Sequence, residues 1–253
     1  MKLIHNFKSP NYNERNSKNV ELVIIHYTAL KSANDSIRYL CSKKTGVSSH
    51  YLISKNGDIY SLVSEKKRAW HAGHSYWDGK KDINSISIGI ELDYFPDKIN
   101  KKYSKKMIIS LTNLLNKLVK KYKILPKNIL GHSDIAPYRK IDPGINFPWI
   151  FFEDKKIAYK VKKLSKKNKY IGLLEKWFLK YGFFSNKKKI LFMLDIIGYD
   201  ISLAKLGKSH FERIIFNYAS RFKPYKNNLL NKNNIIYKIQ CHFLNIILTK
   251  EKK

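Results

Sequence analysis

The chain has 253 residues, 43% of them hydrophobic, which is enough to bury the core of one large domain or of a large and a small domain. Its many aromatic residues, including 17 Tyr and 13 Phe, exclude wholesale disorder, and no apolar run is long enough to span a bilayer. The formal net charge of +31 favours anionic partners, but the lysines are scattered in short runs, which indicates compositional bias and argues against a dedicated nucleic-acid stripe.

The first part of the chain alternates strand and helix patterns. The turn Asn56-Gly57 between two apolar segments predicts a β-hairpin, and apolar residues at helical spacing, among them Leu111 and Leu115, predict a long helix. This order favours an α/β fold with a mixed central β-sheet flanked by helices. The expected elements are a strand at 22–25, a helix at 36–43 capped by Asn34-Asp35, hairpin strands at 50–54 and 59–63, a strand at 87–92, a helix at 104–122 and a strand at 129–131.

The composition changes near Lys155. The lysine-rich segment that follows is typical of a linker or an amphipathic connector, and the helical patterns after it predict a small all-α domain. We therefore expect a large domain at 1–155, a linker at 156–170 and a helical domain at 171–253. The expected helices of that domain lie at 172–181, 187–197, 209–222 and 234–248.

Three polar residues stand where a rigid sheet can hold them in place. His26 and His132 each end an apolar strand, and Asp142 lies in the loop that follows His132. Two imidazoles and one carboxylate are ligands suited to Zn²⁺, and three protein ligands leave a fourth position open for water. The alternative is a structural role, because a single histidine at a strand end is no metal signature by itself.

Two further residues are candidates for chemistry at such a site. Glu91 stands within an otherwise apolar strand, where burial would raise the pKa of its carboxyl and suit it as a general base. The alternative for Glu91 is an edge strand that turns it toward solvent. Lys140 lies two residues before Asp142, so on an extended loop its ammonium can point the same way and reach a developing oxyanion. The alternative for Lys140 is a solvated surface lysine.

The loop from Gly131 to Gly144, GHSDIAPYRKIDPG, resembles the signature of the type 2 N-acetylmuramoyl-L-alanine amidases. Four further blocks resemble those of the same family and occur in its order. They lie at 24–28, 47–53, 68–73 and 84–91. The likeness extends over residues 9–149, and the joint match is far more specific than any single block.

The resemblance implies a zinc-dependent enzyme that hydrolyses the lactyl–L-alanine amide bond of peptidoglycan or muropeptides, built on a mixed sheet with surrounding helices. The related phage lysozyme-type amidases have a tyrosine at the position of Ser49, and its absence here leaves Glu91 as the better base. Carried over residue by residue, the likeness implies zinc ligands at His26, His132 and Asp142, an acid/base at Glu91, an oxyanion stabiliser at Lys140 and substrate-binding residues at Trp70, His71 and Asn84.

Segments 194–200 and 211–224 resemble, with lower specificity, the small helical peptidoglycan-binding domain attached to some of these amidases. Inserted lysines and asparagines depart from that pattern and leave two alternatives: the domain binds glycan, or it packs against the catalytic domain. The likeness implies a zinc amidase domain at 1–155, a linker at 156–170 and a peptidoglycan-binding-like helical domain at 171–253.

The expected partner is peptidoglycan or a muropeptide, with no specific nucleic acid and only weak association with anionic envelope surfaces, and we expect a monomer. The N-terminus lacks the apolar core of a signal peptide, so a cytoplasmic location is expected. A periplasmic or outer-membrane-associated location is the alternative, because the two-domain branch of the family resides in the envelope. The alternative function is a non-catalytic peptidoglycan-binding protein on the same fold, which the three filled ligand positions disfavour.

Overall fold

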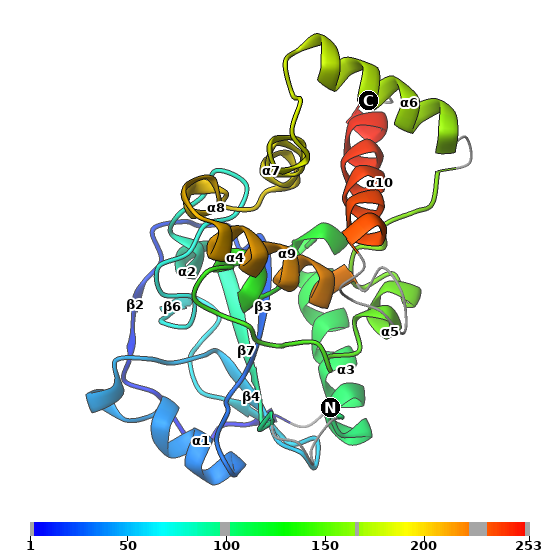
Figure 1. The fold of residues 1–253 in the computed structure, drawn as a ribbon. Helices are drawn as coiled ribbons and strands as arrows, with labels where there is room; N and C mark the ends of the chain where they lie inside the picture. Colours follow the sequence, from blue (N-terminus) through cyan, green and yellow to red (C-terminus); the bar gives the residue numbers. More distant parts are fainter. Residues whose placement is uncertain (1–2, 97–101, 165–166, 223–231, 251–253) are drawn as a thin grey trace.

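The computed structural model describes residues 3–96, 102–164, 167–222 and 232–250 (Figure 1). Its centre is a six-stranded sheet in the order β1-β5-β4-β7-β3-β8, in which β5 runs antiparallel to β4 and the other neighbouring pairs are parallel. The predicted mixed sheet is therefore confirmed. A second, two-stranded antiparallel sheet joins β2 to β6. The strands are β1 (Leu3–Ile4), β2 (Tyr12–Glu14), β3 (Leu22–Tyr27), β4 (Tyr51–Ile53), β5 (Ile59–Ser61), β6 (Lys67–Ala69), β7 (Ser87–Leu92) and β8 (Ile129–Gly131).

The helices of the first part follow from apolar periodicity and capping. In α3 the residues Met107, Leu111 and Leu115 recur on one buried face, and Ser104 Oγ accepts a hydrogen bond from Met107 N at 3.2 Å as the N-cap. Helix α1 begins at Ala33, three residues before the predicted start at 36, because Ser32 caps the helix in place of Asn34-Asp35. The helices are α1 (Ala33–Leu40), α2 (Ile83–Ile86), α3 (Lys105–Tyr122), α4 (His132–Ile135) and α5 (Trp149–Asp154), with 3₁₀ turns at Lys43–Thr45 and Pro126–Asn128.

The last part of the described chain is all helical, as predicted. The short helix α8 was not predicted, because five residues carry too little periodic pattern. The first helix begins at Lys167, inside the predicted linker, and residues 165–166 of that linker lie outside the described ranges. The helices are α6 (Lys167–Lys180), α7 (Asn186–Ile197), α8 (Ser202–Leu206), α9 (Lys208–Phe222) and α10 (Lys232–Lys250). None of the helices in the described ranges has the length and apolarity needed to cross a membrane.

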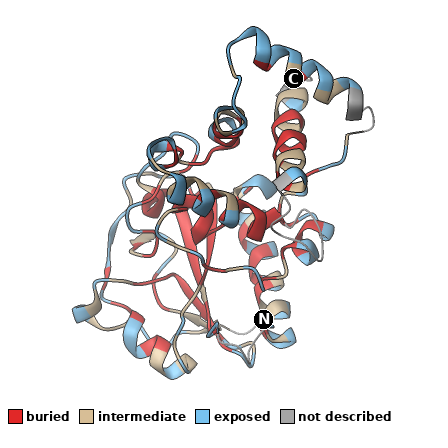
Figure 2. Cartoon of the chain, in the orientation of Figure 1, coloured by how far each residue is buried: buried red, intermediate tan, exposed pale blue. Residues whose placement is uncertain are grey.

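The two faces of the sheet belong to two different hydrophobic clusters. Val23 and Ile25 pack on one face in the cluster that contains the buried side of α3. Ile24 and Leu130 point to the other face and share a cluster with residues of the C-terminal helices, such as Leu194. Figure 2 shows the central strands largely buried between these layers. The C-terminal helices therefore cover one face of the sheet.

The central strands carry polar residues to one edge of the sheet. Strands β7, β3 and β8 are parallel, so their carboxyl ends meet at the same edge. His26 pairs in register with Glu91, which puts both side chains on the same face near that edge. His132 follows β8 directly and opens α4 at the same place. This edge is where the candidate site forms.

Candidate metal centre and active site

Three side chains predicted as metal ligands come together at the carboxyl edge of the sheet. His26 Nδ1 lies 2.9 Å from His132 Nδ1 and 3.2 Å from Asp142 Oδ2, and His132 Nδ1 lies 3.1 Å from the same oxygen. All three residues are buried. They form the only such cluster of His, Cys, Asp and Glu found among the described residues, and its geometry can hold a metal ion.

The hydrogen bonds of His132 determine which of its ring nitrogens carries the proton. His132 Nε2 lies 3.1 Å from the backbone oxygen of Ala72, which can only accept. Nε2 therefore carries the proton. In the neutral ring, which carries one N–H, Nδ1 is left with a lone pair directed at His26 and Asp142.

A chain of hydrogen bonds settles the tautomer of His26 in the same way. Ser87 Oγ donates to Ile83 O at 2.6 Å, so its lone pair accepts from His71 Nε2 at 3.2 Å. His71 Nδ1 is then free to accept the proton of His26 Nε2 at 3.0 Å. His26 Nδ1 is left with a lone pair that points at His132 and Asp142. Burial, followed by the neighbouring histidines, lowers the pKa of His71 well below its ordinary value, so its ring is neutral.

Gly89 leaves space for the His71 ring in this series of hydrogen bonds. A Cβ on Gly89 would lie 2.4 Å from Cγ of the His71 ring, a distance that real side chains do not adopt. The glycine in the middle of β7 therefore lets the ring lie directly against the strand.

With these tautomers, the Nδ1 lone pairs of His26 and His132 and the Asp142 carboxylate face one another with no proton between them. A bound cation would stabilise this arrangement. Burial and then the neighbouring His132 lower the pKa of His26 to about 4, so the ring supplies no positive charge near neutral pH. The observed separations of 2.9 to 3.2 Å are close to the roughly 3.3 Å between ligand atoms in tetrahedral zinc sites. The residues present thus fit a zinc ion.

Glu91 and Lys140 line the pocket beside this cluster. The pocket has a volume of about 470 Å³, and Asp142, His132 and Trp70 also line it. Strand β7 lies between β4 and β3, so the alternative of an edge position for Glu91 is wrong. Glu91 Oε2 is buried and has no hydrogen-bond partner within the described ranges. Burial, then the charge of Asp142, raises the pKa of Glu91 to about 8, with Lys140 acting in the opposite direction.

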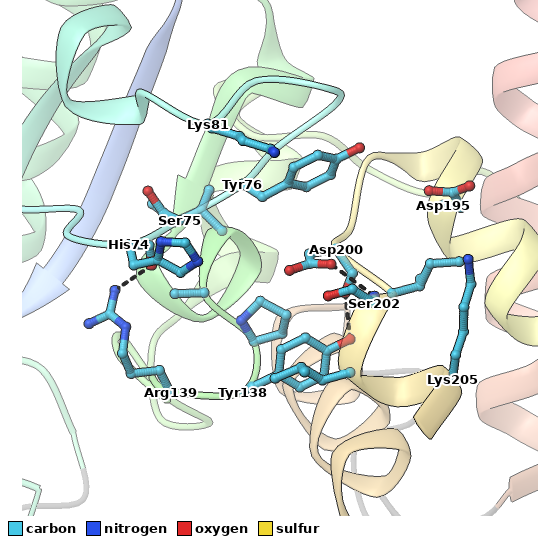
Figure 3. Close-up of a pocket in the computed structure, with 15 residues that line it drawn as sticks. His74, Ser75, Tyr76, Lys81, Tyr138, Arg139, Asp195, Asp200, Ser202 and Lys205 are labelled. Carbon is cyan, nitrogen blue, oxygen red and sulfur yellow. Dashed lines mark hydrogen bonds between the residues drawn. The ribbon is translucent and has the colours of Figure 1, made fainter. Parts of the chain in front are cut away.

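Sequence reasoning missed Arg139, the residue before Lys140. Its Nη2 donates to the backbone oxygen of Ala72 at 2.8 Å and to that of His74 at 2.8 Å, the latter drawn in Figure 3. Arg139 therefore ties the segment after β8 to the loop after β6. Arg139 also lines the pocket beside the metal cluster. Its place inside the 131–144 signature was the available signal, but neighbouring positions in a loop do not reveal which backbone carbonyls an arginine will reach.

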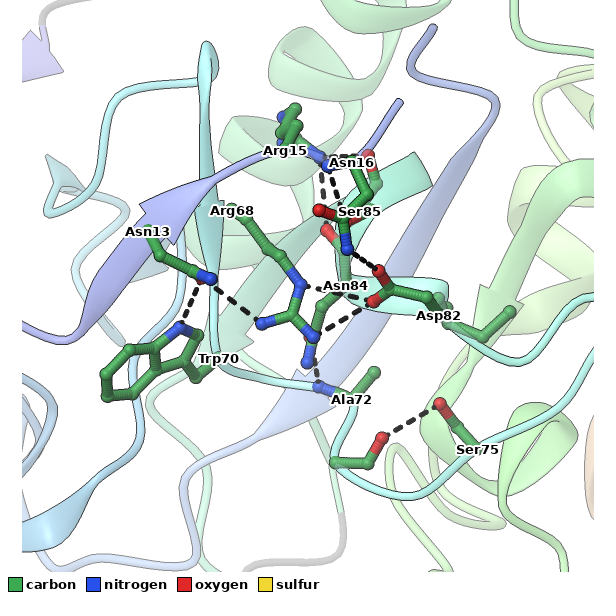
Figure 4. A network of polar contacts seen from close by, with 12 residues as sticks. Asn13, Arg15, Asn16, Arg68, Trp70, Ala72, Ser75, Asp82, Asn84 and Ser85 are labelled. Atoms are coloured by element: carbon green, nitrogen blue, oxygen red, sulfur yellow. Dashed lines mark hydrogen bonds and ion pairs between the residues drawn. The ribbon is translucent and has the colours of Figure 1, made fainter. Parts of the chain in front are cut away.

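The residues predicted to bind substrate occupy two different places. Trp70 and His71 line the pocket, whereas Asn84 is buried beneath it. Asn84 Oδ1 accepts a hydrogen bond from the backbone nitrogen of His71 at 3.1 Å and another from that of Ala72 at 2.8 Å. Figure 4 shows the contact with Ala72, together with the hydrogen bond that Trp70 Nε1 donates to Asn13 Oδ1 at 2.8 Å. Asn84 thus holds the backbone that carries the pocket wall. Direct contact of these three residues with a substrate stays a prediction.

Known proteins resemble this chain in sequence. The family model described as N-acetylmuramoyl-L-alanine amidase matches residues 16–145. The N-acetylmuramoyl-L-alanine amidase AmiD of Escherichia coli is 40% identical over 143 residues, which is 51% of this chain and 51% of that protein. The chain therefore spans about half the length of that relative. The 1,6-anhydro-N-acetylmuramyl-L-alanine amidase AmpD of Haemophilus influenzae is 35% identical over 161 residues, 56% of this chain and 86% of that protein.

Solved structures show the same architecture over nearly the whole chain. E. coli AmiD, in complex with its substrate anhydro-N-acetylmuramic acid-L-Ala-D-gamma-Glu-L-Lys, has a TM-score of 0.74 and 26% identity, covering 93% of this chain and 98% of its own. AmpDh3 of Pseudomonas aeruginosa has a TM-score of 0.73 and 26% identity, covering 96% of this chain and 99% of its own. The chain belongs to the type 2 N-acetylmuramoyl-L-alanine amidase family.

Proposed function

We propose that this protein is a zinc-dependent N-acetylmuramoyl-L-alanine amidase that hydrolyses the lactyl–L-alanine amide bond of peptidoglycan or muropeptides. The observation that carries the proposal is that the side chains of His26, His132 and Asp142 meet beside a pocket that Glu91 and Lys140 also line. The named activities of the relatives, and the muramyl peptide bound to E. coli AmiD, support the choice of substrate.

His26, His132 and Asp142 would hold the zinc ion. When bound, zinc lowers the pKa of a coordinated water toward ~7 and polarises a carbonyl oxygen. His71 and the Ala72 carbonyl, which contact the outer nitrogens of the two rings, would orient His26 and His132 for binding the ion.

Glu91 would move the proton. Its carboxyl lies on the same face of the sheet as His26 and opens to the pocket with one oxygen unpartnered. A carboxyl whose pKa lies near the working pH can accept a proton from water and return it to a leaving nitrogen. Glu91 would therefore act first as base and then as acid toward the amine of L-alanine.

Lys140 would stabilise the negative charge that develops on the carbonyl oxygen of the lactyl group. It is half-buried on the pocket wall, and its charge acts on both Glu91 and His26. An ammonium in a partly water-excluded pocket stabilises a developing oxyanion more than it does the neutral amide, which lowers the barrier.

Release of stem peptides from purified muropeptides, followed by mass spectrometry, tests the proposal. Chelator treatment should abolish release, and stoichiometric Zn²⁺ should restore it. Whole sacculi, assayed in parallel, would show which form of the substrate is used. A protein that binds peptidoglycan but takes up no metal and releases no peptide would instead be the non-catalytic alternative.

A further inference from the structure

The loop that carries Lys140 and Asp142 is held from behind by the C-terminal helices. Asn217 of α9 is fully buried, and its Nδ2 donates to the backbone oxygens of Pro137 at 2.7 Å and of Lys140 at 2.9 Å. Its Oδ1 is buried with no hydrogen-bond partner in the described part of the chain. The Asn217 side chain therefore forms hydrogen bonds through its amide nitrogen alone, and both are donated to the loop that carries Lys140 and Asp142.

A second contact fixes the same loop between those two carbonyls. Tyr138 Oη donates to the backbone oxygen of Asp200 at 2.7 Å (Figure 3) and accepts from the backbone nitrogen of Ala204 at 3.1 Å. Both partners belong to the turn and helix that follow α7. The phenol thus spans from the loop to α8.

The start of the loop is tied down as well. Tyr199 Oη donates to Asp134 Oδ1 at 2.6 Å, while Asp134 Oδ2 accepts from the backbone nitrogen of Gly131 at 2.7 Å. Both side chains are buried, and α9 contacts α4, which holds Asp134 (Figure 1). The C-terminal part of the chain therefore contacts the 131–144 segment at Asp134, at Tyr138 and, through Asn217, at the carbonyls on either side of Tyr138.

These contacts bear on chemistry because the peptide carbonyl that Asn217 holds belongs to Lys140 itself. Fixing that carbonyl fixes the backbone from which the Lys140 side chain enters the pocket, two residues before the ligand Asp142. Displacing a catalytic group by about 1 Å can cost about 100-fold in rate. Loss of the amide would also leave two loop carbonyls without this donor.

We propose that Asn217 is a positioning residue for the amidase reaction, through which the C-terminal helices hold Lys140 and Asp142 in their working geometry. The inference rests on the proposed function for its effect on turnover. Its effect on loop order is independent of that function.

The variant Asn217→Leu, made in the full chain, removes the amide with little change in size. Asn245→Leu is the matched control, because Asn245 is also an asparagine of a C-terminal helix whose amide oxygen accepts from the backbone, at Lys162 N 2.8 Å away. Hydrogen exchange of the backbone amides of Arg139 and Lys140 measures the order of the loop directly, because both amides donate to Ala136 O.

Asn217→Leu should speed exchange of these two amides about 10-fold or more and lower kcat by about 10- to 100-fold with KM changed less than about 3-fold. Zinc affinity, measured by competition with a chelating dye, should fall as well, because Asp142 shares the loop. Asn245→Leu should leave all three unchanged. Equal exchange, kcat and zinc affinity in the two variants would overturn the inference.

If Asn217→Leu does not fold, Asn217→Ala decides by the same measurements, because it removes the same amide without placing a larger apolar group against the two loop carbonyls. Faster loop exchange in Asn217→Ala supports the inference, and unchanged exchange overturns it. A wild-type protein without amidase activity would refute the proposed function, while the exchange comparison would still decide the role of Asn217.

Discussion

Replacing His71 by Phe removes the acceptor that fixes the tautomer of His26. In the wild-type protein, a proton on His26 Nδ1 would leave Nε2 facing the lone pair of His71 Nδ1 at 3.0 Å, which disfavours that tautomer. With Phe at position 71 this opposition is gone. The metal-free ring would then place its proton on Nδ1 and donate to Asp142 Oδ2, which lies 3.2 Å away.

The size of the effect follows from the hydrogen bond that zinc would have to displace. A hydrogen bond to a charged carboxylate contributes about 1.5–3 kcal/mol, which corresponds to about 10- to 100-fold in zinc affinity. Loss of a hydrogen-bond partner of a zinc-ligating histidine commonly has an effect of this size. His71→Asn offers an amide oxygen near the position of Nδ1 and should recover part of the loss.

Zinc affinity is measured by competition with a chelating dye near neutral pH, for wild type, His71→Phe, His71→Asn and His242→Phe. His242→Phe is the matched control, because His242 is also buried but lies in α10 against Tyr218. The control should bind zinc like wild type. An affinity of His71→Phe within about 2-fold of wild type would refute the tautomer reasoning.

Three further predictions concern β7. Glu91→Gln should keep zinc affinity and lose turnover by about 100- to 10,000-fold, as single-turnover peptide release would show; activity near wild type would remove Glu91 from the reaction. Because burial raises the pKa of Glu91 to about 8 from about 4.3 in the unfolded chain, the folded metal-free protein holds a proton that the unfolded chain has lost. The free energy of unfolding of the metal-free protein should therefore fall as pH rises from about 5 to 8. Denaturant titrations should show a smaller fall in Glu91→Gln, and an equal dependence of the unfolding free energy on pH in the two proteins would contradict the raised pKa. Gly89→Ala should weaken zinc binding by displacing the His71 ring, and unchanged affinity together with an unchanged thermal midpoint would contradict the close contact between them.

The parts of the fold that could be predicted from sequence are those with strong local patterns. Strand β3 and helix α3 bury continuous or periodic apolar residues, which local sequence records directly. Strands β1, β2 and β6 have two or three residues each and are defined by their pairing partners, so no local sequence pattern predicts them.

The candidate site divides in the same way. The cluster of His26, His132 and Asp142 was foreseeable, because strand ends and the family signature point to them. The partners behind the cluster were not, because each depends on packing between distant segments. Asn217 and Pro137, for example, are 80 residues apart and meet only after α9 has packed beside α4.

The zinc absorption edge of the purified protein, recorded together with its metal content, tests the central claim most directly. One zinc ion per chain is expected, surrounded by two imidazole nitrogens and by oxygen ligands, with no sulfur. Substituting Asp142 by Ala should remove most of the metal. A sulfur ligand from Cys41 or Cys241, or a protein that takes up no zinc, would contradict the account.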